Sequence, residues 1–320
     1  MRIAGLVHTL DVHGGVRRYF EIGNAVVRAG HEFILFANTI HEKKPWMEFL
    51  GEVRPYHEAR TTSVDMIFTN APECCPDMEQ ARAGVKVVLV VSKFNGHIYK
   101  DIWKRFGSKF LWIGVESNWN QGLEEIQGVC IPGGVNTEFF VPAIRHVNEK
   151  PVVSFHSRFW PGRGIEDIDS LAMSLAGAVK FVGYDAPGYP IFNGFGNAVE
   201  LRINESQEQL RETLQGSDII LSAMTTAGWN NNIAEGMACY CAPISTPAGV
   251  ANLIEDGVNG FVVPNNDLIN QARERIMKLN SDRELLEDMQ LRSAKVVKSF
   301  TWVNFCDRMI KEVEGFKNVS

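Results

Sequence analysis

Short runs of apolar, often β-branched residues alternate with longer helical stretches along most of the chain. In the first half these runs occupy residues 3–8, 32–37, 64–69, 85–91, 111–115 and 129–131. In the second half they occupy residues 152–155, 179–182, 219–221, 242–244 and 260–263. Near-continuous apolar runs are typical of strands buried on both faces, and strands alternating with helices favour parallel sheets with crossover connections. The pattern therefore predicts an α/β fold of the doubly wound type.

The chain is long enough for two such sheets. It has 320 residues, and a domain takes roughly 150. Val141-Pro142 and Lys150-Pro151 bracket a polar segment where a join is expected. We therefore predict two Rossmann-like, doubly wound parallel-sheet domains that face each other across a cleft. They would cover residues 1–142 and 143–300, and a C-terminal helix over 301–320 would pack back on the first domain.

Two helix starts can be read from capping residues. Ser206 is followed three positions later by Gln209, the pattern of a capping box. Ser281 and Glu284 stand in the same relation, which predicts a second helix that begins after Ser281.

Charge and composition exclude several classes of protein. The net charge of −6 argues against nucleic-acid binding, which needs a basic face to replace counterions. The longest stretch without charged residues, 236–254, contains Pro243 and Pro247 and is too polar for a membrane span. No targeting segment is visible. Six cysteines without a CxxC pair disfavour a disulfide framework or a structural zinc, and favour reduced cysteines in a cytoplasmic protein.

Ligands of doubly wound sheets bind beyond the carboxyl ends of the strands, so the loops after the predicted strands are the places to search. Gly14-Gly15 follows the first strand and opens a helix. Two glycines let the backbone approach a ligand, and a helix N-terminus favours an anion. The spacing is not that of a dinucleotide fingerprint, and a tight turn without a ligand is the alternative.

The loop after the run 152–155 carries Arg158 and Arg163 around a Pro-Gly turn. The turn could direct both guanidinium groups toward one point, and their planar forks suit phosphate. Two solvated arginines in a surface loop are the alternative.

The loop after the run 219–221 leads into a helix from about Asn232. A carboxylate early in that helix, Glu235, can accept hydrogen bonds from vicinal ribose hydroxyls, although it could merely complement the helix dipole. The loop offers backbone amides and side-chain amides from five adjacent positions: Gly228, Trp229, Asn230, Asn231 and Asn232.

A basic amphipathic stretch lies at residues 93–109. Its apolar positions recur every four residues, at Phe94, Ile98, Ile102 and Phe106, with Trp103 alongside. Its basic residues are Lys93, Lys100, Lys104, Arg105 and Lys109. Such a stretch could lie on an anionic membrane and bring the protein to a lipid-linked acceptor. The alternative is an ordinary domain helix with its apolar stripe in the core.

The order and spacing of these loops resemble the retaining glycosyltransferases of family 4 (group 1), which have the GT-B fold. The matching segments are Gly14-Gly15, residues 131–142, Arg158 with Arg163-Gly164, residues 235–239, residues 254–263 and Phe300-Thr301-Trp302. The resemblance covers nearly the whole chain and is most specific in the second half.

The resemblance implies a division of labour between the domains. The second domain would hold a nucleotide-sugar and the first a carbohydrate or lipid-linked acceptor. Arg158 and Arg163 would grip the diphosphate, although the family usually has lysine at the second position. Glu235 would hold the ribose, and Gly14 and Gly15 would lie against the diphosphate and sugar. The family needs no metal or other cofactor, and no Asp-x-Asp element is obviously placed to hold one.

The sequence departs from the family at two positions. The family has a pair of glutamates eight positions apart, and the first position here is Ala227. Asn230, Asn231 and Asn232 would supply donors there instead. Many members also have a histidine after the run 85–91, where this chain has Ser92 and Lys93. Either His97 serves the acceptor side as a catalytic group, or no histidine is required. Structural roles are the expectation for three others: His8, His13 and His156.

These observations predict a hexosyltransferase-type retaining enzyme that moves a sugar from a nucleotide-diphosphate sugar to a glycan, glycolipid or small polyol. We expect it in the cytoplasm, with peripheral contact at the inner face of the membrane as a variant. The alternatives are another GT-B enzyme, namely a sugar-nucleotide epimerase or a phosphorylase, and a non-catalytic nucleotide- or sugar-binding protein.

Overall fold

The chain folds into two compact units, each built on its own parallel sheet. The computed structural model describes residues 1–11, 14–38, 47–92, 96–143, 148–159, 161–185, 192 and 194–317. The N-terminal unit comprises Met1–Gly134 with Trp302–Ser320, and the C-terminal unit comprises Val135–Thr301.

The division after Gly134 lies eight residues before the boundary expected at Pro142. The backbone amide of Val135 donates to the carbonyl of Phe300 at 2.8 Å, and Val135 also bridges to Thr301. The carbonyl of Val141 accepts from the Gln215 side chain at 2.7 Å. Because these contacts are long-range, the proline pattern near residue 142 could not reveal that residues 135–142 contact the C-terminal unit.

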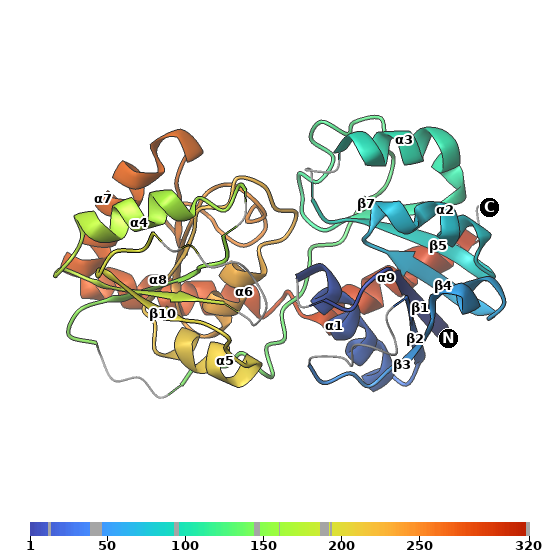
Figure 1. Ribbon diagram of the computed structural model, residues 1–320, viewed down its shortest axis with the longest axis horizontal. Helices are drawn as coiled ribbons and strands as arrows, with labels where there is room; N and C mark the ends of the chain where they lie inside the picture. The colour runs from blue at the N-terminus through green and yellow to red at the C-terminus, as the bar shows by residue number, and fades with distance from the viewer. Residues whose placement is uncertain are drawn as a thin grey trace. The chain divides into compact units, whose positions relative to one another are not determined.

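The N-terminal unit has a seven-stranded sheet in the order β3-β2-β1-β4-β5-β6-β7, with every neighbouring pair parallel (Figure 1). Its strands are β1 (Arg2–Val7), β2 (Glu32–Ala37), β3 (Glu52–Pro55), β4 (Val64–Thr69), β5 (Ala83–Val90), β6 (Leu111–Gly114) and β7 (Val129–Cys130). Its helices are α1 (Gly14–Arg28), α2 (Cys75–Gln80), α3 (Gly96–Phe106) and α9 (Trp302–Lys317), with short 3₁₀ turns η1 (Tyr56–Arg60), η2 (Pro72–Cys74) and η4 (Gly107–Lys109).

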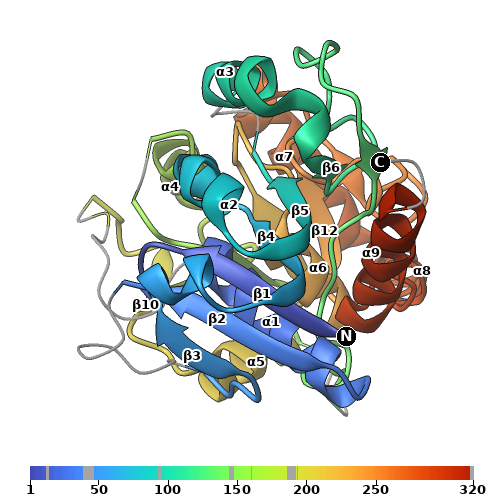
Figure 2. The ribbon, with the colours of Figure 1, turned by 90° about the vertical axis from the view of Figure 1, so that its right-hand side faces the viewer.

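Helices cover both faces of this sheet. Tyr19 of α1 stacks on Phe68 of β4 on one face, with ring centroids 5.2 Å apart. On the other face, Met78 of α2 and Ile102 of α3 join a buried cluster with Ile67 of β4. Figure 2 shows α2 in front of the strands and α1 behind them. Successive residues of a strand point to opposite faces, so adjacent Ile67 and Phe68 serve different layers.

The last helix returns to the N-terminal unit. Helix α9 packs against α1, where the Cys306 thiol donates to the carbonyl of Ile22 at 3.7 Å. Arg308 of α9 also donates to the carbonyl of Cys130, at the end of β7, at 3.0 Å.

The C-terminal unit has a six-stranded parallel sheet in the order β10-β9-β8-β11-β12-β13. Its strands are β8 (Val152–His156), β9 (Lys180–Tyr184), β10 (Val199–Arg202), β11 (Ile219–Ser222), β12 (Ala242–Ser245) and β13 (Phe261–Val262). Its helices are α4 (Ile165–Ser174), α5 (Gln207–Gln215), α6 (Asn231–Ala238), α7 (Leu268–Ser281) and α8 (Arg283–Val297), with the 3₁₀ turn η5 (Asn265–Asp267).

The core of this unit again has two layers. Leu221 of β11 packs in a buried cluster with residues of α4 and α7, which lie side by side in Figure 1. Ile220, next in the strand, faces the other way and contacts α6. A Cβ placed on Gly236 of α6 would lie only 2.7 Å from the Ile220 Cβ, so this glycine allows the helix to approach the sheet closely.

The predicted parallel α/β architecture is confirmed, but the sequence did not indicate two strands. Both β3 and β10 lie at a sheet edge, and none of their residues is fully buried. Half-exposed strands such as Val199-Glu200-Leu201-Arg202 lack the continuous apolar run of a central strand.

One of the two predicted helix caps is correct. Ser206 and Gln209 form the complete capping box of α5. The cap of α8 was predicted wrongly, because Asp282 and not Ser281 accepts from the Leu285 amide, at 2.9 Å. Helix α7 continues through Ser281, so only one residue separates α7 from α8.

Candidate functional site

Each sheet has one point at which the strand order reverses. These switch points lie between β1 and β4 in the N-terminal unit and between β8 and β11 in the C-terminal unit. Crevices at such points, outside the carboxyl ends of the strands, are where doubly wound sheets bind ligands. Gly14-Gly15 follows β1, Arg158 and Arg163 follow β8, and residues 228–235 follow β11. The predicted donor residues of the C-terminal unit therefore surround its switch point.

Arg158 is buried at the carboxyl end of β8 and bound to an acid that was not among the predicted site residues. Its Nη2 donates to Oδ1 of Asp185 at 3.1 Å, and the two residues are 7% and 3% exposed. Asp185 directly follows β9, the neighbour of β8 in the sheet. An acid three residues past the apolar run 179–182 was the signal that could have identified it.

His156 lies beside this pair and is held neutral. Its Nδ1 accepts from the backbone amide of Arg158 at 3.3 Å, and its Nε2 lies 3.5 Å from Asp185 Oδ1. Burial, reinforced by the charges of Arg163 and Arg158, lowers the pKa of His156 well below its usual value of 6.5. A neutral ring that accepts at Nδ1 carries its proton on Nε2, so it directs a donor toward Asp185.

Arg163 extends the positive region along the loop. The residue lies between Gly162 and Gly164, whose φ angles of +82° and +64° favour glycine. Its Nη1 contacts the sulfur of Met224 at 3.3 Å. Burial lowers the pKa of Arg163, and the nearby charge of Arg158 lowers it further. The repulsion between the buried guanidinium group of Arg158 and the half-buried one of Arg163 would be relieved by an anion.

The loops after β8 and β11 are joined by direct hydrogen bonds. The backbone amide of Thr225 donates to the carbonyl of Gly162 at 2.8 Å, and the Thr225 hydroxyl lies 3.3 Å from the same oxygen. A Cβ on Gly164 would lie 2.6 Å from both the Cβ and the carbonyl oxygen of Ala223. The arginine loop therefore rests directly on the loop after β11.

Two residues predicted to bind the donor have side chains engaged within the protein. Asn230 caps α6, since its Oδ1 accepts from the Ile233 amide at 3.4 Å and its Nδ2 donates to Ser222 at 2.9 Å. Trp229 is buried and packs edge-on against Phe300, with ring centroids 5.4 Å apart. These side chains shape the loop.

Of the remaining predicted positions, Gly228 lies two residues before the capping Asn230, and Asn231 and Asn232 begin the helix. Gly228 is buried, and Asn231 and Asn232 are half-buried on the first turn of α6. Their backbone amides are at the N-terminal end of the helix, where the helix dipole favours an anion.

Glu235 reaches the same edge of the sheet from α6. It is 4% exposed, and its charge contributes to the raised pKa of Tyr184, whose main cause is burial. The charge of Asp185 also raises the pKa of Tyr184, which is the last residue of β9. Arg158, Arg163 and Asp185 therefore lie together at the carboxyl ends of β8 and β9, and Glu235 is linked to them through its electrostatic effect on Tyr184.

In the N-terminal unit, the double-glycine loop contacts the loop after β4. Gly14 is exposed and begins α1, and the carbonyl of Gly15 accepts from the Asn70 side chain at 2.9 Å. Asn70 directly follows β4, so the contact spans the switch point of this sheet. His13 lies outside the described residues.

His97 is exposed on the first turn of α3. The apolar stripe of that helix faces the core of the unit, through Ile98, Ile102, Trp103 and Phe106. Lys100 pairs with Glu125 at 3.3 Å, and Lys104 lies 3.8 Å from Asp101. These contacts favour the ordinary domain helix over a membrane-binding surface. Lys93 and Phe94 lie outside the described residues.

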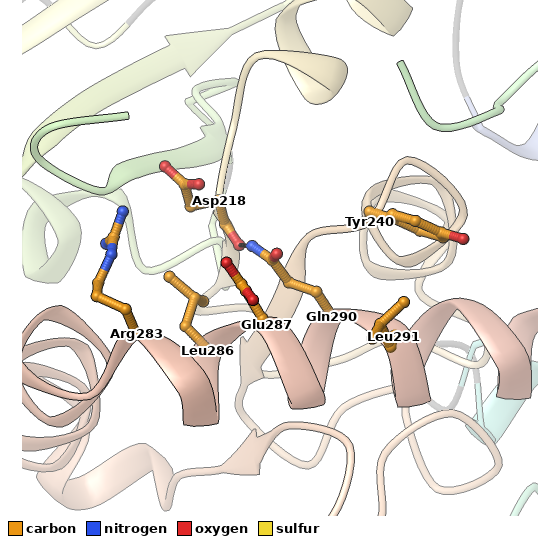
Figure 3. A pocket seen from close by; sticks show the side chains of 7 residues that line it. All are labelled: Asp218, Tyr240, Arg283, Leu286, Glu287, Gln290 and Leu291. Carbon is orange, nitrogen blue, oxygen red and sulfur yellow. Dashed lines mark hydrogen bonds between the residues drawn. The ribbon is translucent and has the colours of Figure 1, made fainter. Parts of the chain in front are cut away.

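A separate pocket of about 290 Å³ lies at the opposite edge of the C-terminal sheet (Figure 3). Asp218, before β11, and Tyr240, before β12, line it together with residues of α8. Gln290 donates across it to the carbonyl of Asp218 at 2.9 Å. Because this pocket is at the amino ends of the strands, it does not belong to the candidate site.

The part of the chain that the structure describes contains no group of three or more His, Cys, Asp or Glu side chains that could hold a metal ion. Within the same residues, no helix has both the length and the apolar character that crossing a membrane requires.

Comparisons with known proteins agree with this architecture. The family model described as "Glycosyl transferases group 1" matches residues 134–282, almost all within the C-terminal unit. A search of curated proteins by sequence found no match.

Several solved structures share the whole fold. The structure of Anabaena HepE in complex with UDP-glucose aligns over 98% of this chain and 100% of the HepE chain, with 16% identity and a TM-score of 0.78. Sucrose-phosphate synthase from Thermosynechococcus elongatus covers 100% of both chains, with 15% identity and a TM-score of 0.80. A glycosyltransferase from Rickettsia africae aligns over 100% of this chain and 99% of its own chain, with 16% identity and a TM-score of 0.77. The predicted GT-B fold is confirmed.

Proposed function

We propose that the chain is a retaining glycosyltransferase that moves a sugar from a nucleotide-diphosphate sugar to a glycan, glycolipid or small polyol. The observation that carries the proposal is the pair Arg158 and Arg163, whose enclosed charges repel each other at the switch point of the C-terminal sheet. The family match to this same unit supports a donor site there.

The two arginines suit the departure of a diphosphate. As the bond between the anomeric carbon and the phosphate oxygen breaks, its electron pair moves onto the nucleoside diphosphate. Fixed guanidinium groups stabilise the charge that develops there. The acceptor oxygen bonds to the anomeric carbon on the face that the leaving group quits, and its proton passes to a phosphate oxygen. With the leaving-group charge met by Arg158 and Arg163, we propose that transfer needs no metal.

Glu235 would hold the ribose hydroxyls, with the backbone of Gly228, Asn231 and Asn232 beside the diphosphate and sugar. The complexes of HepE with UDP-glucose, and with UDP and glucose, make UDP-glucose the first donor to test, in keeping with a hexosyl transfer. The acceptor would bind to the N-terminal unit near the exposed His97, and Gly14 and Gly15 of that unit would lie against the diphosphate and sugar. None of the six cysteines, all of which lie in the described part of the chain, forms a disulfide, which supports a cytoplasmic location.

A second candidate is a binding protein without transferase activity. The observation that favours it is Ala227, which replaces a carboxylate that the resembled family places near the donor sugar. Such a protein would bind a nucleotide or sugar through the same arginines.

Release of nucleoside diphosphate from a panel of donors, beginning with UDP-glucose, distinguishes the two candidates. We expect slow release by the purified full chain without acceptor, and the same rate in EDTA. Glu235→Ala should weaken UDP binding, measured by calorimetry, whereas Glu274→Ala, at an exposed position of α7, should not. Binding of UDP without release from any donor of the panel would reject the transferase and favour the binding protein.

A further inference from the structure

Arg18 of α1 is a buried cation without a partner in the described part of the chain. The residue is 4% exposed, and its guanidinium forms no hydrogen bond or ion pair with any described residue. Its Nε is fully enclosed. The preceding Arg17 differs, since its Nε lies 3.8 Å from Glu21 one turn further along the helix. A buried charge without a counter-charge is strongly unfavourable, so Arg18 requires an explanation.

Tyr99 of α3 is a second enclosed donor beside it. Its side chain is fully buried, and its hydroxyl forms no hydrogen bond of ordinary geometry among the described residues. The backbone amide of Val91, just past β5, faces the hydroxyl oxygen. That oxygen could accept from the amide, but the hydroxyl proton would still lack an acceptor.

The two groups are electrostatic neighbours. Burial lowers the pKa of Arg18 to about 10, with Tyr19 and Tyr99 opposing the shift, so the guanidinium stays protonated at neutral pH. Burial raises the pKa of Tyr99, and the charge of Arg18 acts in the opposite direction. Both groups therefore remain hydrogen-bond donors.

Nearby polar groups have complete networks. The Tyr19 hydroxyl donates to the carbonyl of Leu6 at 2.9 Å and accepts from the Asn70 amide at 2.8 Å. Among the described residues, Tyr19 thus differs from Arg18 and Tyr99, whose buried donors have no acceptor.

The positions of these residues indicate the carboxyl edge of the sheet. Arg18 is the fifth residue of α1, and helical side chains lean toward the N-terminus of their helix. Tyr99 lies close to Val91, which follows the carboxyl end of β5. The N-terminus of α1, a helix of 15 residues, lies at the same edge and adds positive potential.

We infer that Arg18 and Tyr99 bind a phosphate group at the carboxyl edge of the N-terminal sheet. The guanidinium fork can donate two parallel hydrogen bonds to phosphate oxygens, and the Tyr99 hydroxyl can donate a third. The anion would supply both the missing negative charge and the missing acceptors. The site does not depend on sugar transfer. That its phosphate belongs to a phosphorylated acceptor rests on the proposed function.

Calorimetry on the full chain without any nucleotide-sugar tests the inference. The probes are inorganic phosphate, glycerol 3-phosphate and acetate, at an ionic strength held constant with sodium chloride. We expect Arg18→Met to weaken phosphate binding at least about tenfold, and Tyr99→Phe about threefold, from the usual strengths of charged and neutral hydrogen bonds. Arg28→Met is the matched control. It removes the same charge from the exposed far end of α1 and should leave binding unchanged.

The outcomes separate the possible ligands. Tighter binding of glycerol 3-phosphate supports a phosphorylated organic ligand, and equal binding supports the free ion. Tighter binding of acetate than of either phosphate would overturn the assignment to phosphate. Unchanged phosphate affinity in both variants, or no binding of phosphate by the wild type, would overturn the site itself. If Arg18→Met does not fold, the phosphate affinity of Tyr99→Phe alone tests the site. None of these measurements uses donor release, so failure here leaves the proposed transferase untouched.

Discussion

Arg158 Nη2 and Asp185 Oδ1 lie 3.1 Å apart, in two residues that are both more than nine-tenths buried. The contact joins the ends of the neighbouring strands β8 and β9. Because Asp185 orients the guanidinium in the absence of a ligand, less side-chain entropy is lost when a diphosphate binds. Asp185 is therefore a positioning residue for the candidate site, and the pair leads to the first prediction.

Asp185→Ala should lower the free energy of unfolding by roughly 3–5 kcal/mol, since it removes the carboxylate from a buried arginine. Denaturation in urea measures the change. The control is Glu200→Ala, which breaks an exposed pair with Lys180 at 2.6 Å and should cost roughly 0–1 kcal/mol. Equal, small losses in the two variants would show that Asp185 contributes no more than a surface charge.

Arg158→Ala and Arg163→Ala should each weaken UDP binding by roughly 1.5–3 kcal/mol, or about ten- to 150-fold, if both contacts with the diphosphate are charge-assisted. Calorimetry with UDP gives the affinities directly. Arg292→Ala on α8 removes an exposed arginine paired with Asp288 at 2.8 Å and should bind UDP like the wild type. Wild-type UDP affinity in both loop variants would show that the diphosphate does not bind to this loop.

His156 should make the protein less stable in mild acid. Its folded pKa lies well below its usual 6.5, so the unfolded chain takes up a proton that the folded protein does not. Stability is therefore retained above about pH 6.5 and declines as the pH falls, by at most about 1.4 kcal/mol per pH unit from this residue. Urea denaturation at pH 7.5 and 5.5 should show a larger loss in the wild type than in His156→Gln. Equal losses would mean that His156 protonates as readily in the folded state.

Gly164→Ala should be more damaging than Gly177→Ala. Both glycines have positive φ angles, +64° and +85°, so each substitution costs roughly 1–2 kcal/mol of backbone strain. A Cβ at Gly164 would also meet Ala223 at 2.6 Å, whereas nothing lies within 4 Å of a Cβ at Gly177. We expect an additional loss of roughly 1–3 kcal/mol in thermal or urea denaturation of Gly164→Ala. It should also weaken UDP binding, because Arg163 is adjacent, and Gly177→Ala should not.

Local patterns were sufficient for the central strands and for some helix ends. The run 219–221 is apolar because β11 lies in the middle of its sheet, and Ser206 with Gln209 forms a cap through bonds three residues apart. Edge strand β10 was not recognised, since its alternating charges reflect a half-exposed position that only the completed sheet defines.

In the candidate site, too, local patterns identified some residues, whereas tertiary packing determined the roles of others. Arg158, Arg163 and Glu235 could be selected because each follows a recognisable strand or opens a recognisable helix. The roles of Trp229 and Asn230 could not, because Phe300 and Ser222, which occupy their side chains, are determined by packing.

Short-range periodicity and turn residues were enough to predict the parallel α/β architecture and the loops in which ligand-binding residues should be sought, because both depend on residues close together in the chain. Contacts between distant segments were needed to show that Asp185 holds Arg158, that residues 135–142 belong with the C-terminal unit, and that Arg18 and Tyr99 are neighbours. Arg18 and Tyr99 are separated by 80 intervening residues and come together only when the sheet orders its strands. The cost of burying a charge appears only then, because desolvation depends on what surrounds a side chain and not on its neighbours in sequence.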